Sequence, residues 1–400
     1  PFEPRILGYL RLDPPIPRMH RRTPEGVERD IRERIFPRDW FHPTYEGGAD
    51  WQKALDRVNT AAARIARVVV HPDYRSEGFG ALLVRVALEW AKERGAPEAR
   101  REKHLVYTIA QMARYHPFFE KVGFRYLFDT ASGRPVLFYP LTEEAEAHLE
   151  RFLREDPYAK AHGGRLYKPR FGRVPGLPGP IRLAGVHKAY RSHLDLEGLS
   201  REVQEALLAF GVKARVVERA VLRGASLEIP PGSLVVLAGA SGAGKTTLLR
   251  LLLGEAPDAG EVAVPPGRRV AYIPGEREVD LGEAPILEAV YRRLKDVGAA
   301  IEVLNRVGLS DAVLYRARPH ELSTGQRERF RLALLLAERP DLLLIDEFAA
   351  HLDVPTARRV ALGLGKLCRE AGVTLVAATH RPEVVAALDP DLLVYVGYGG

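Results

Sequence analysis

The residues best suited to chemistry form one glycine-rich run, Gly239-Ala240-Ser241-Gly242-Ala243-Gly244-Lys245-Thr246, with Thr247 after it. The glycines let successive backbone N–H groups turn toward phosphate oxygens, and a following helix adds the positive end of its dipole. Lys245 is placed to reach the β- and γ-phosphates of a nucleotide, and the Thr246 hydroxyl to ligate Mg²⁺. A chance glycine-rich turn is the alternative, but the apolar strand before the run and the helix after it favour a site for ATP and Mg²⁺.

Two adjacent carboxylates, Asp346 and Glu347, lie further along the chain, where they end the apolar run Leu342–Ile345. Asp346 is suited to the Mg²⁺ shell, and Glu347 is suited to be the base that orients an attacking water. Many apolar strands end in Asp, so the pair gains its meaning from the motifs around it.

Three further motifs surround these carboxylates in a fixed order. Leu322-Ser323-Thr324-Gly325-Gln326 precedes them, His351-Leu352-Asp353 follows them, and His380 comes after the next apolar run. In this order the motifs resemble the ATPase domain of the ABC superfamily, over about residues 181–400. The resemblance implies that they are the signature loop, the D-loop and the switch histidine, with Lys245, Glu347 and His380 as catalytic residues.

The resemblance also implies a homodimer that sandwiches two ATP molecules. Ser323 and the N–H of Gly325 from a second copy, again at a helix N-terminus, would close the γ-phosphate side of each phosphate loop. Hydrolysis would then open the sandwich, which makes the dimer a two-state clamp.

Two positions need separate treatment. The family carries a Gln after the second apolar strand, where this chain has Gly275 followed by Glu276. The family also has an aromatic ring that stacks on adenine. If the chain has no insertion, the family spacing places Val216 at that position. Tyr190 fits better if residues 192–219 are an insertion. Tyr190 is therefore the predicted platform, with a half-buried strand tyrosine as the alternative.

A second site is indicated nearer the N-terminus. Val68-Val69-Val70 ends a predicted strand, and Arg75-Ser76-Glu77-Gly78-Phe79-Gly80 leads into a predicted amphipathic helix whose N–H groups suit a pyrophosphate. With Tyr115–Phe124, this segment resembles the GNAT acetyltransferases over about residues 6–139. It resembles more closely the ABC-type ATPases that are fused to a predicted acetyltransferase domain. The resemblance implies a strand that splays to admit the pantetheine of acetyl-CoA, with residues 75–80 around its pyrophosphate.

The chemistry of acetyl transfer is less well supported by the residues. In many GNAT enzymes a Tyr four residues before the closing Gly-Phe protonates the leaving thiolate, but Phe119 stands there and its ring cannot donate a proton. Tyr115 and His116 are the remaining candidates for acetyl transfer, and both could instead be packing residues. Three hypotheses stay open: an ATPase that also acetylates an amine on a protein or nucleic acid, an ATPase whose degenerate GNAT module only binds or organises, and the energy subunit of a transporter.

Alternating strands and helices must position these residues, which predicts an α/β fold. An incomplete GNAT-like α+β domain (1–142) is expected first, then a helix and basic connector (143–180), then a P-loop ABC ATPase domain with a helical subdomain (181–400). The charged stretch Met19–Arg38 is expected to be a solvated helix with its loops. Parallel strands buried on both faces are expected at the continuous apolar runs Leu234–Leu237, Val270–Ile273, Leu342–Ile345 and Thr374–Ala377.

The connector is rich in Gly, Pro and cations. Its cations and aromatic residues are Lys160, Arg165, Lys168, Arg170, Arg173, Tyr158, Tyr167 and Phe171. Cations and rings together suit phosphate contacts and base stacking, so DNA or RNA is a candidate partner. A solvated linker is the alternative.

Composition sets wider limits. The 400 residues carry a net charge of +7, and the single cysteine, Cys368, excludes an intramolecular disulfide and a cysteine-clustered zinc site. No apolar run reaches the roughly 20 residues of a membrane helix, and no signal peptide is recognisable, so a cytoplasmic protein is expected. Few Asn, Met and Cys with many Arg indicate a thermophile, and the lack of Met at residue 1 suggests a missing upstream piece.

Overall fold

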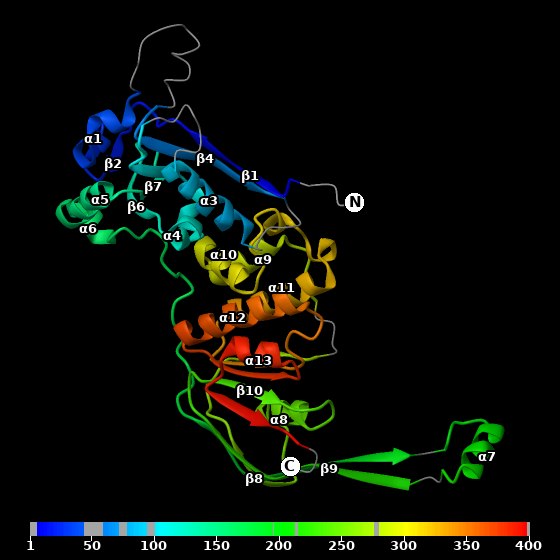
Figure 1. Ribbon diagram of the computed structural model, residues 1–400. Coiled ribbons are helices and arrows are strands. Elements are labelled where there is room, and N and C mark those ends of the chain that lie inside the picture. The colour runs from blue at the N-terminus through cyan, green and yellow to red at the C-terminus, as the bar shows by residue number, and fades with distance from the viewer. Residues whose placement is uncertain are drawn as a thin grey trace. The chain divides into compact units, whose positions relative to one another are not determined.

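A computed structural model describes residues 6–43, 59–71, 78–93, 101–194, 196–212, 215–275 and 280–397. The chain forms two compact units, residues 1–169 and residues 170–400 (Figure 1). The division falls inside the segment 143–180, for which the sequence predicts a separate connector. The earlier part of that segment belongs to the N-terminal unit and the later part to the C-terminal unit.

The N-terminal unit is built on a five-stranded sheet with the order β1-β4-β5-β7-β6. β4 and β5 run parallel, and the other neighbouring strands run antiparallel. The strands are β1 (Gly8–Asp13), β4 (Ala62–Val70), β5 (Leu105–Ile109), β6 (Arg125–Asp129) and β7 (Pro135–Pro140). The helices that pack on the sheet are α3 (Phe79–Glu93), α4 (Phe118–Val122), α5 (Glu143–Glu155) and α6 (Pro157–His162).

Alternate residues of β5 serve two cores, one on each face of this sheet. Leu105 and Tyr107 pack with residues of α5 and α6, whereas Val106 packs with residues of α3 and α4. This alternation follows from the two-residue period of a strand, and it accounts for the strongly apolar composition of β5.

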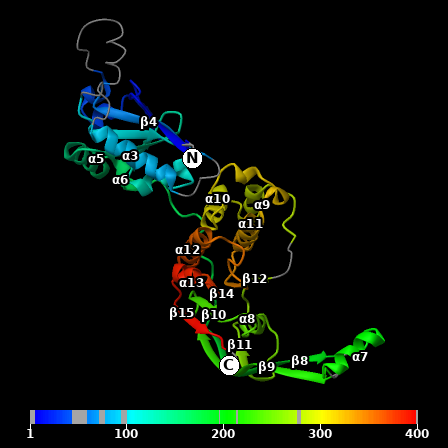
Figure 2. The ribbon, with the colours of Figure 1, turned by 45° about the vertical axis from the view of Figure 1, so that its right-hand side comes forward.

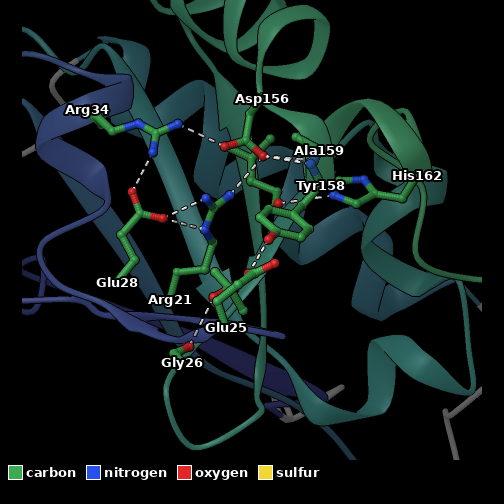
Figure 3. A network of polar contacts seen from close by, with 11 residues as sticks. Arg21, Glu25, Gly26, Glu28, Arg34, Asp156, Tyr158, Ala159 and His162 are labelled. Atoms are coloured by element: carbon green, nitrogen blue, oxygen red, sulfur yellow. Dashed lines mark hydrogen bonds and ion pairs between the residues drawn. The ribbon is translucent and has the colours of Figure 1, made fainter.

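The stretch Met19–Arg38 is not a solvated helix, so this expectation is wrong. It forms a hairpin of β2 (Arg21–Thr23) and β3 (Gly26–Glu28), and then the short helix α1 (Arg32–Ile35). A 3₁₀ helix, Arg38–Phe41, follows. Several of the charged side chains pair with one another, as Figure 3 shows for Arg21, Glu28 and Arg34. Most large apolar residues of this region are buried, namely Met19, Ile31, Ile35, Phe36, Trp40 and Phe41, whereas Val27 is exposed.

The C-terminal unit contains a five-stranded parallel sheet with the order β12-β13-β14-β10-β15. Every residue of β13 and β14 is buried, as expected for parallel strands that helices cover on both faces. The strands are β10 (Leu234–Ala238), β12 (Val270–Ile273), β13 (Leu342–Ile345), β14 (Thr374–Thr379) and β15 (Leu392–Tyr395). The four predicted parallel strands are therefore confirmed.

Helices of this unit fall into two groups. α9 (Ile286–Leu294), α10 (Val297–Arg306) and α11 (Thr324–Ala337) lie side by side as a helical subdomain (Figure 2). Two short 3₁₀ helices, Leu314–Arg316 and Pro319–Glu321, precede α11. The second group is α8 (Lys245–Leu252), α12 (Val354–Ala371) and α13 (Pro382–Leu388), and one further helix, α7, is described below.

A second, antiparallel sheet of this unit has the order β11-β8-β9, with β8 (Ile181–Leu194), β9 (Arg215–Ile229) and β11 (Ala259–Ala263). The ends of β8 and β9 extend beyond the rest of the unit and carry α7 (Arg201–Ala209) between them (Figures 1 and 2). This projection, here called the arm, coincides with the insertion that the sequence predicts after Tyr190. No residue of α7 is buried.

The connector is tied down at both ends. Glu120 accepts hydrogen bonds from the backbone N–H groups of Leu166 and Tyr167 in the N-terminal unit. In the C-terminal unit, buried Glu302 accepts from the N–H groups of Arg170 and Phe171. Phe171 is 1% exposed and belongs to the core, so it is not free to stack on a base. The expectation of an interleaved stacking surface is wrong at that residue.

Candidate nucleotide site

The predicted ATPase motifs meet at one edge of the parallel sheet. Because neighbouring strands run parallel, the carboxyl ends of β10, β12, β13 and β14 lie together. The phosphate loop follows β10, Asp346 and Glu347 follow β13, and His380 follows β14. Gly275 stands two residues after β12, at the same edge.

Two glycines of the phosphate loop have a positive φ and no room for a side chain. Gly239 has φ 147°, and a Cβ on it would lie 2.2 Å from the carbonyl oxygen of Val396. Gly244 has φ 114°, and its Cβ would lie 2.6 Å from Cγ1 of Val221. The chain therefore turns tightly into α8, whose N-terminal N–H groups face the loop and suit a phosphate.

Lys245 is folded back onto the loop. Its Nζ donates to the carbonyl oxygens of Gly239, at 2.7 Å, and Ala240, at 2.8 Å. Burial lowers the pKa of Lys245, while the carboxylates of Asp346 and Glu347 act in the opposite direction. An anionic phosphate offers this ammonium a stronger partner than two carbonyls.

Thr246 and Asp346 meet across the gap between α8 and β13. The Thr246 hydroxyl donates to Oδ2 of Asp346 at 2.7 Å, and Asp346 is 7% exposed. A hydroxyl and a carboxylate are oxygen ligands of the kind Mg²⁺ takes beside nucleotide phosphates and water, so the pair fits this ion. Within the described ranges no three His, Cys, Asp or Glu side chains gather as a metal site, so Mg²⁺ would depend on nucleotide oxygens and water.

Glu347 and His380 are exposed at this edge. Glu347 has a left-handed backbone, with φ 49°, and its side chain lies against Gly275. The neighbouring Glu276, named above after Gly275, lies outside the described residues.

The signature loop is a helix start. Ser323 is the N-cap of α11: its Oγ accepts from the N–H of Gln326 at 3.3 Å, and Oε1 of Gln326 accepts from the N–H of Ser323 at 2.9 Å. A Cβ on Gly325 would lie 3.1 Å from Cδ2 of Leu352, so the signature loop and the D-loop touch within one chain. Asp353 of the D-loop caps α12 by accepting from the N–H of Thr356 at 2.9 Å.

Arg381 is a further residue of this region, and the sequence motifs do not mark it. Its NH1 donates to the carbonyl oxygens of Ala349, at 2.6 Å, and Leu352, at 2.5 Å. Its Nε pairs with Glu383 at 2.7 Å. Arg381 directly follows His380, so these hydrogen bonds tie the D-loop backbone to the segment that carries His380. Only its position beside His380 could have drawn attention to it.

Tyr190 lies on β8 directly opposite Arg219 on β9, so both side chains are on one face of this ladder. NH2 of Arg219 donates to the carbonyl oxygen of Gly242 in the phosphate loop at 2.9 Å. The Tyr190 hydroxyl donates to Oε1 of Glu255, beyond the end of α8, at 3.1 Å. Tyr190 is thus partly buried beside α8. The alternative Val216 has a side chain outside the described residues.

The predicted CoA site lies in the N-terminal unit. β4 pairs with β5 only from Ala62 to Ile65, and Val68-Val69-Val70 pair with β1 alone, so the two parallel strands part at their carboxyl ends. Gly78 directly precedes α3, which begins at Phe79, and Gly80 lies against Phe118 of α4, with a Cβ position 3.1 Å from its ring. Arg75, Ser76 and Glu77 lie outside the described residues.

The candidates for acetyl transfer, Tyr115 and His116, lie between β5 and α4 in the chain. Burial, with the charge of Lys121 nearby, lowers the pKa of His116 to about 4, and its buried Nδ1 has no hydrogen-bond partner within the described ranges. Tyr115 is half-buried. Phe119 is 5% exposed and packs edge-on against the rings of Phe118 and Phe124.

The parallel sheet and the phosphate loop at its edge define a P-loop nucleotide-binding protein. Residues 222–350 match the ABC transporter family, and residues 46–126 match the acetyltransferase (GNAT) domain. The zinc import ATP-binding protein ZnuC of Ruegeria pomeroyi is 34% identical over 198 residues, which are 48% of this chain and 75% of that protein. The chain therefore belongs to the ABC family of ATP-binding proteins, and it carries a GNAT domain ahead of the ABC domain.

Other relatives are similar to the same part of the chain. The lipoprotein-releasing system ATP-binding protein LolD 1 of Rhodospirillum rubrum is 35% identical, over 42% of this chain and 84% of its own length. The methionine import ATP-binding protein MetN of Mesorhizobium japonicum is 34% identical, and the chain spans only 56% of its length. Among solved structures, cbiO1 from Clostridium perfringens has a TM-score of 0.40 at 19% identity, covering 55% of this chain and 85% of that one.

The two family matches and the order of the elements confirm the expected family, the order of the two domains and the fold class, a GNAT-like α+β domain followed by a P-loop ABC domain with a helical subdomain. They also confirm the expected class of enzyme for the C-terminal domain, an ABC-type ATP hydrolase. Across the described ranges, no helix is both long and apolar enough to cross a membrane.

Proposed function

We propose that this chain hydrolyses ATP at the interface of a homodimer. The observation that carries the proposal is the meeting of the phosphate loop, Asp346, Glu347 and His380 at the carboxyl edge of one parallel sheet. In this proposal Lys245 and the loop N–H groups bind the β- and γ-phosphates, and Thr246 with Asp346 holds Mg²⁺. Glu347 orients the attacking water, and His380 lies beside the γ-phosphate.

Exposure supports the dimer. Residues 240–242 of the phosphate loop are exposed, so a bound nucleotide would be open to solvent there. Ser323 is also exposed, at the N-terminus of the 14-residue helix α11. N–H groups at a helix start attract anions, so the signature loop of a second copy suits the uncovered γ-phosphate.

The ATPase proposal is tested by removing the phosphate-binding ammonium. Lys245→Ala should abolish phosphate release from Mg·ATP by the full chain, because the γ-phosphate loses its charged partner. Arg250→Ala removes an exposed cation from the same helix and should leave turnover near that of the parent. Near-normal hydrolysis by Lys245→Ala would show that the phosphate loop is wrongly assigned.

We propose further that the GNAT domain binds acetyl-CoA as an organising module and transfers no acetyl group. Phe119 favours this, since a buried phenyl ring stands where a proton donor is needed. His116 favours it too, because burial lowers its pKa to about 4, so the imidazole is neutral near pH 7 and has no imidazolium proton to give to the leaving thiolate. An active acetyltransferase acting on a protein or nucleic-acid amine is the competing hypothesis.

Acetyl-CoA itself distinguishes these two hypotheses. Titration calorimetry of the full chain should show acetyl-CoA binding, while a thiol assay with polyamine, histone-type peptide and nucleic acid shows no CoA release above buffer. Absence of binding would refute the organising module. Release of CoA thiol in step with acetylation of an acceptor would refute its inactivity.

The names of the relatives give a second candidate, the energy subunit of an import system. Recovery of a stoichiometric membrane permease with the chain from gently solubilised cells would favour it. DNA or RNA remains a candidate partner because Lys160, Lys168 and Arg173 are exposed. Binding of nucleic acid that weakens with salt, and weakens again when Lys168, Arg170 and Arg173 are neutralised, would support that partner.

A further inference from the structure

Gly275 has no backbone reason to be glycine. Its φ is not in the left-handed region, in contrast to many other glycines of this chain. A Cβ at Gly275 would, however, lie 2.9 Å from Oε2 of Glu347 and 3.0 Å from both Cδ and Cγ of the same side chain. The space that a side chain would need at residue 275 is therefore filled by the carboxyl group of Glu347.

The backbone of Glu347 is held from both sides, so it cannot easily yield. Its N–H donates to Oδ1 of Asp346 at 3.1 Å, and its carbonyl oxygen accepts from the N–H of Ala350 at 3.1 Å. Phe348, the next residue, is 4% exposed and donates its N–H to the carbonyl oxygen of Ala378 at 2.8 Å. Glu347 itself has the left-handed φ of 49°, which a residue with a side chain adopts only when its surroundings enforce it.

We propose that Gly275 is a positioning residue for Glu347. Because residue 275 has no side chain, the carboxylate of Glu347 can occupy the space beside it, and this space is here called the seat. The proposal rests on the ATPase function proposed above, in which Glu347 orients water. Glu347 is exposed and its side chain is flexible, so a methyl group at residue 275 is accommodated by rotation of the carboxylate. The fold therefore tolerates an alanine at residue 275, but the Glu347 carboxylate moves away from the position in which it orients water.

This seat gives a physical reason for the departure from the family pattern. A Gln at residue 275 would place a whole side chain where the Glu347 carboxylate now lies. Gly275 and Glu347 thus form a matched pair, and restoring the family's Gln alone should harm this enzyme rather than improve it.

Gly275→Ala tests the pair in the full chain. Its kcat for ATP should fall by roughly 100-fold, because a base displaced by about 1 Å loses its alignment with the water. The KM for ATP and the melting temperature should stay at the parent values. Gly179→Ala is the matched control: no atom lies within 4 Å of its Cβ position and its φ is ordinary, so kcat should not change.

A double variant separates action through Glu347 from unrelated damage. If Gly275 acts only by seating Glu347, then Gly275→Ala combined with Glu347→Gln should have the kcat of Glu347→Gln alone. A parent-like kcat for Gly275→Ala, or a further loss in the double variant, would overturn the seat. If neither the parent chain nor Gly179→Ala hydrolyses ATP, the proposed function is refuted, and the inference with it.

Discussion

At the scale of single residues, Asp156 is a buried carboxylate with several charged and backbone partners. Its side chain is 1% exposed and pairs with Arg21 and Arg34, each at 2.9 Å (Figure 3). It also accepts from the backbone N–H groups of Tyr158, at 3.1 Å, and Ala159, at 3.0 Å. Burial by itself raises the pKa of this carboxyl, but the hydrogen bonds from Arg21 and the backbone outweigh burial and hold the pKa below its ordinary value.

Asp156→Asn should therefore destabilise the N-terminal unit. Removing one charge from a buried pair leaves Arg21, which is 3% exposed, short of a partner, so we expect a loss of about 3 kcal/mol in the free energy of unfolding. Urea unfolding followed by tryptophan fluorescence measures it, because Trp40, Trp51 and Trp90 all belong to this unit.

The pH dependence of that loss has a definite sign. A carboxyl whose pKa is lowered by folding stabilises the folded state above its ordinary pKa, and the stabilisation disappears as the pH falls through the folded-state pKa. The difference between parent and Asp156→Asn should shrink below about pH 4. Glu155→Gln, the same loss of charge at an exposed neighbour, should have little effect. Equal stability of parent and Asp156→Asn at pH 7 would contradict the assigned role.

Residue by residue, the sequence could predict what is local. The glycines of the phosphate loop, the signature loop at a helix N-terminus and the carboxylates after β13 are recognisable from spacing and from neighbours along the chain. The contact of Gly275 with Glu347, and the bonds of Arg381 to the D-loop, join segments that only the folded sheet brings together. No local pattern encodes such contacts.

At the scale of elements, continuous apolar runs made four of the parallel strands predictable, most clearly β13 and β14, whose two faces are both buried. The hairpin of β2 and β3 was not predictable in this way. Its strands have three residues each and are stabilised by ion pairs to distant residues, which in sequence resemble a solvated charged stretch. The prediction of a base-stacking surface on the connector failed at Phe171 for a related reason. The backbone of Phe171 is held by Glu302, more than a hundred residues away.

The arm is an element whose position, but not whose form, could be predicted. The sequence marks an insertion after Tyr190, and the structure gives it as extensions of β8 and β9 that carry α7. Arg219, at the root of the arm, donates to Gly242 of the phosphate loop. The arm is thus directly connected to the loop that is proposed to hold the nucleotide.

At the scale of the whole molecule, two families of domain are joined in one chain, and the proposed cycle requires two copies of it. The phosphate loop and the signature loop are both exposed, and each offers what the other lacks: a place for the γ-phosphate and a helix N-terminus to cover it. ATP binding should therefore join two chains, and hydrolysis should release them.

The most direct test of this account is the size of Glu347→Gln in solution with Mg·ATP. The amide keeps the shape of the side chain but cannot serve as the base, so ATP stays bound and the sandwich should persist. Light scattering coupled to size exclusion should give a mass twice the 44.5 kDa of one chain with ATP, and the mass of one chain without it. Lys245→Ala combined with Glu347→Gln should remain a monomer in both conditions. A Glu347→Gln variant that binds ATP yet stays a monomer would contradict the nucleotide-sandwiched homodimer.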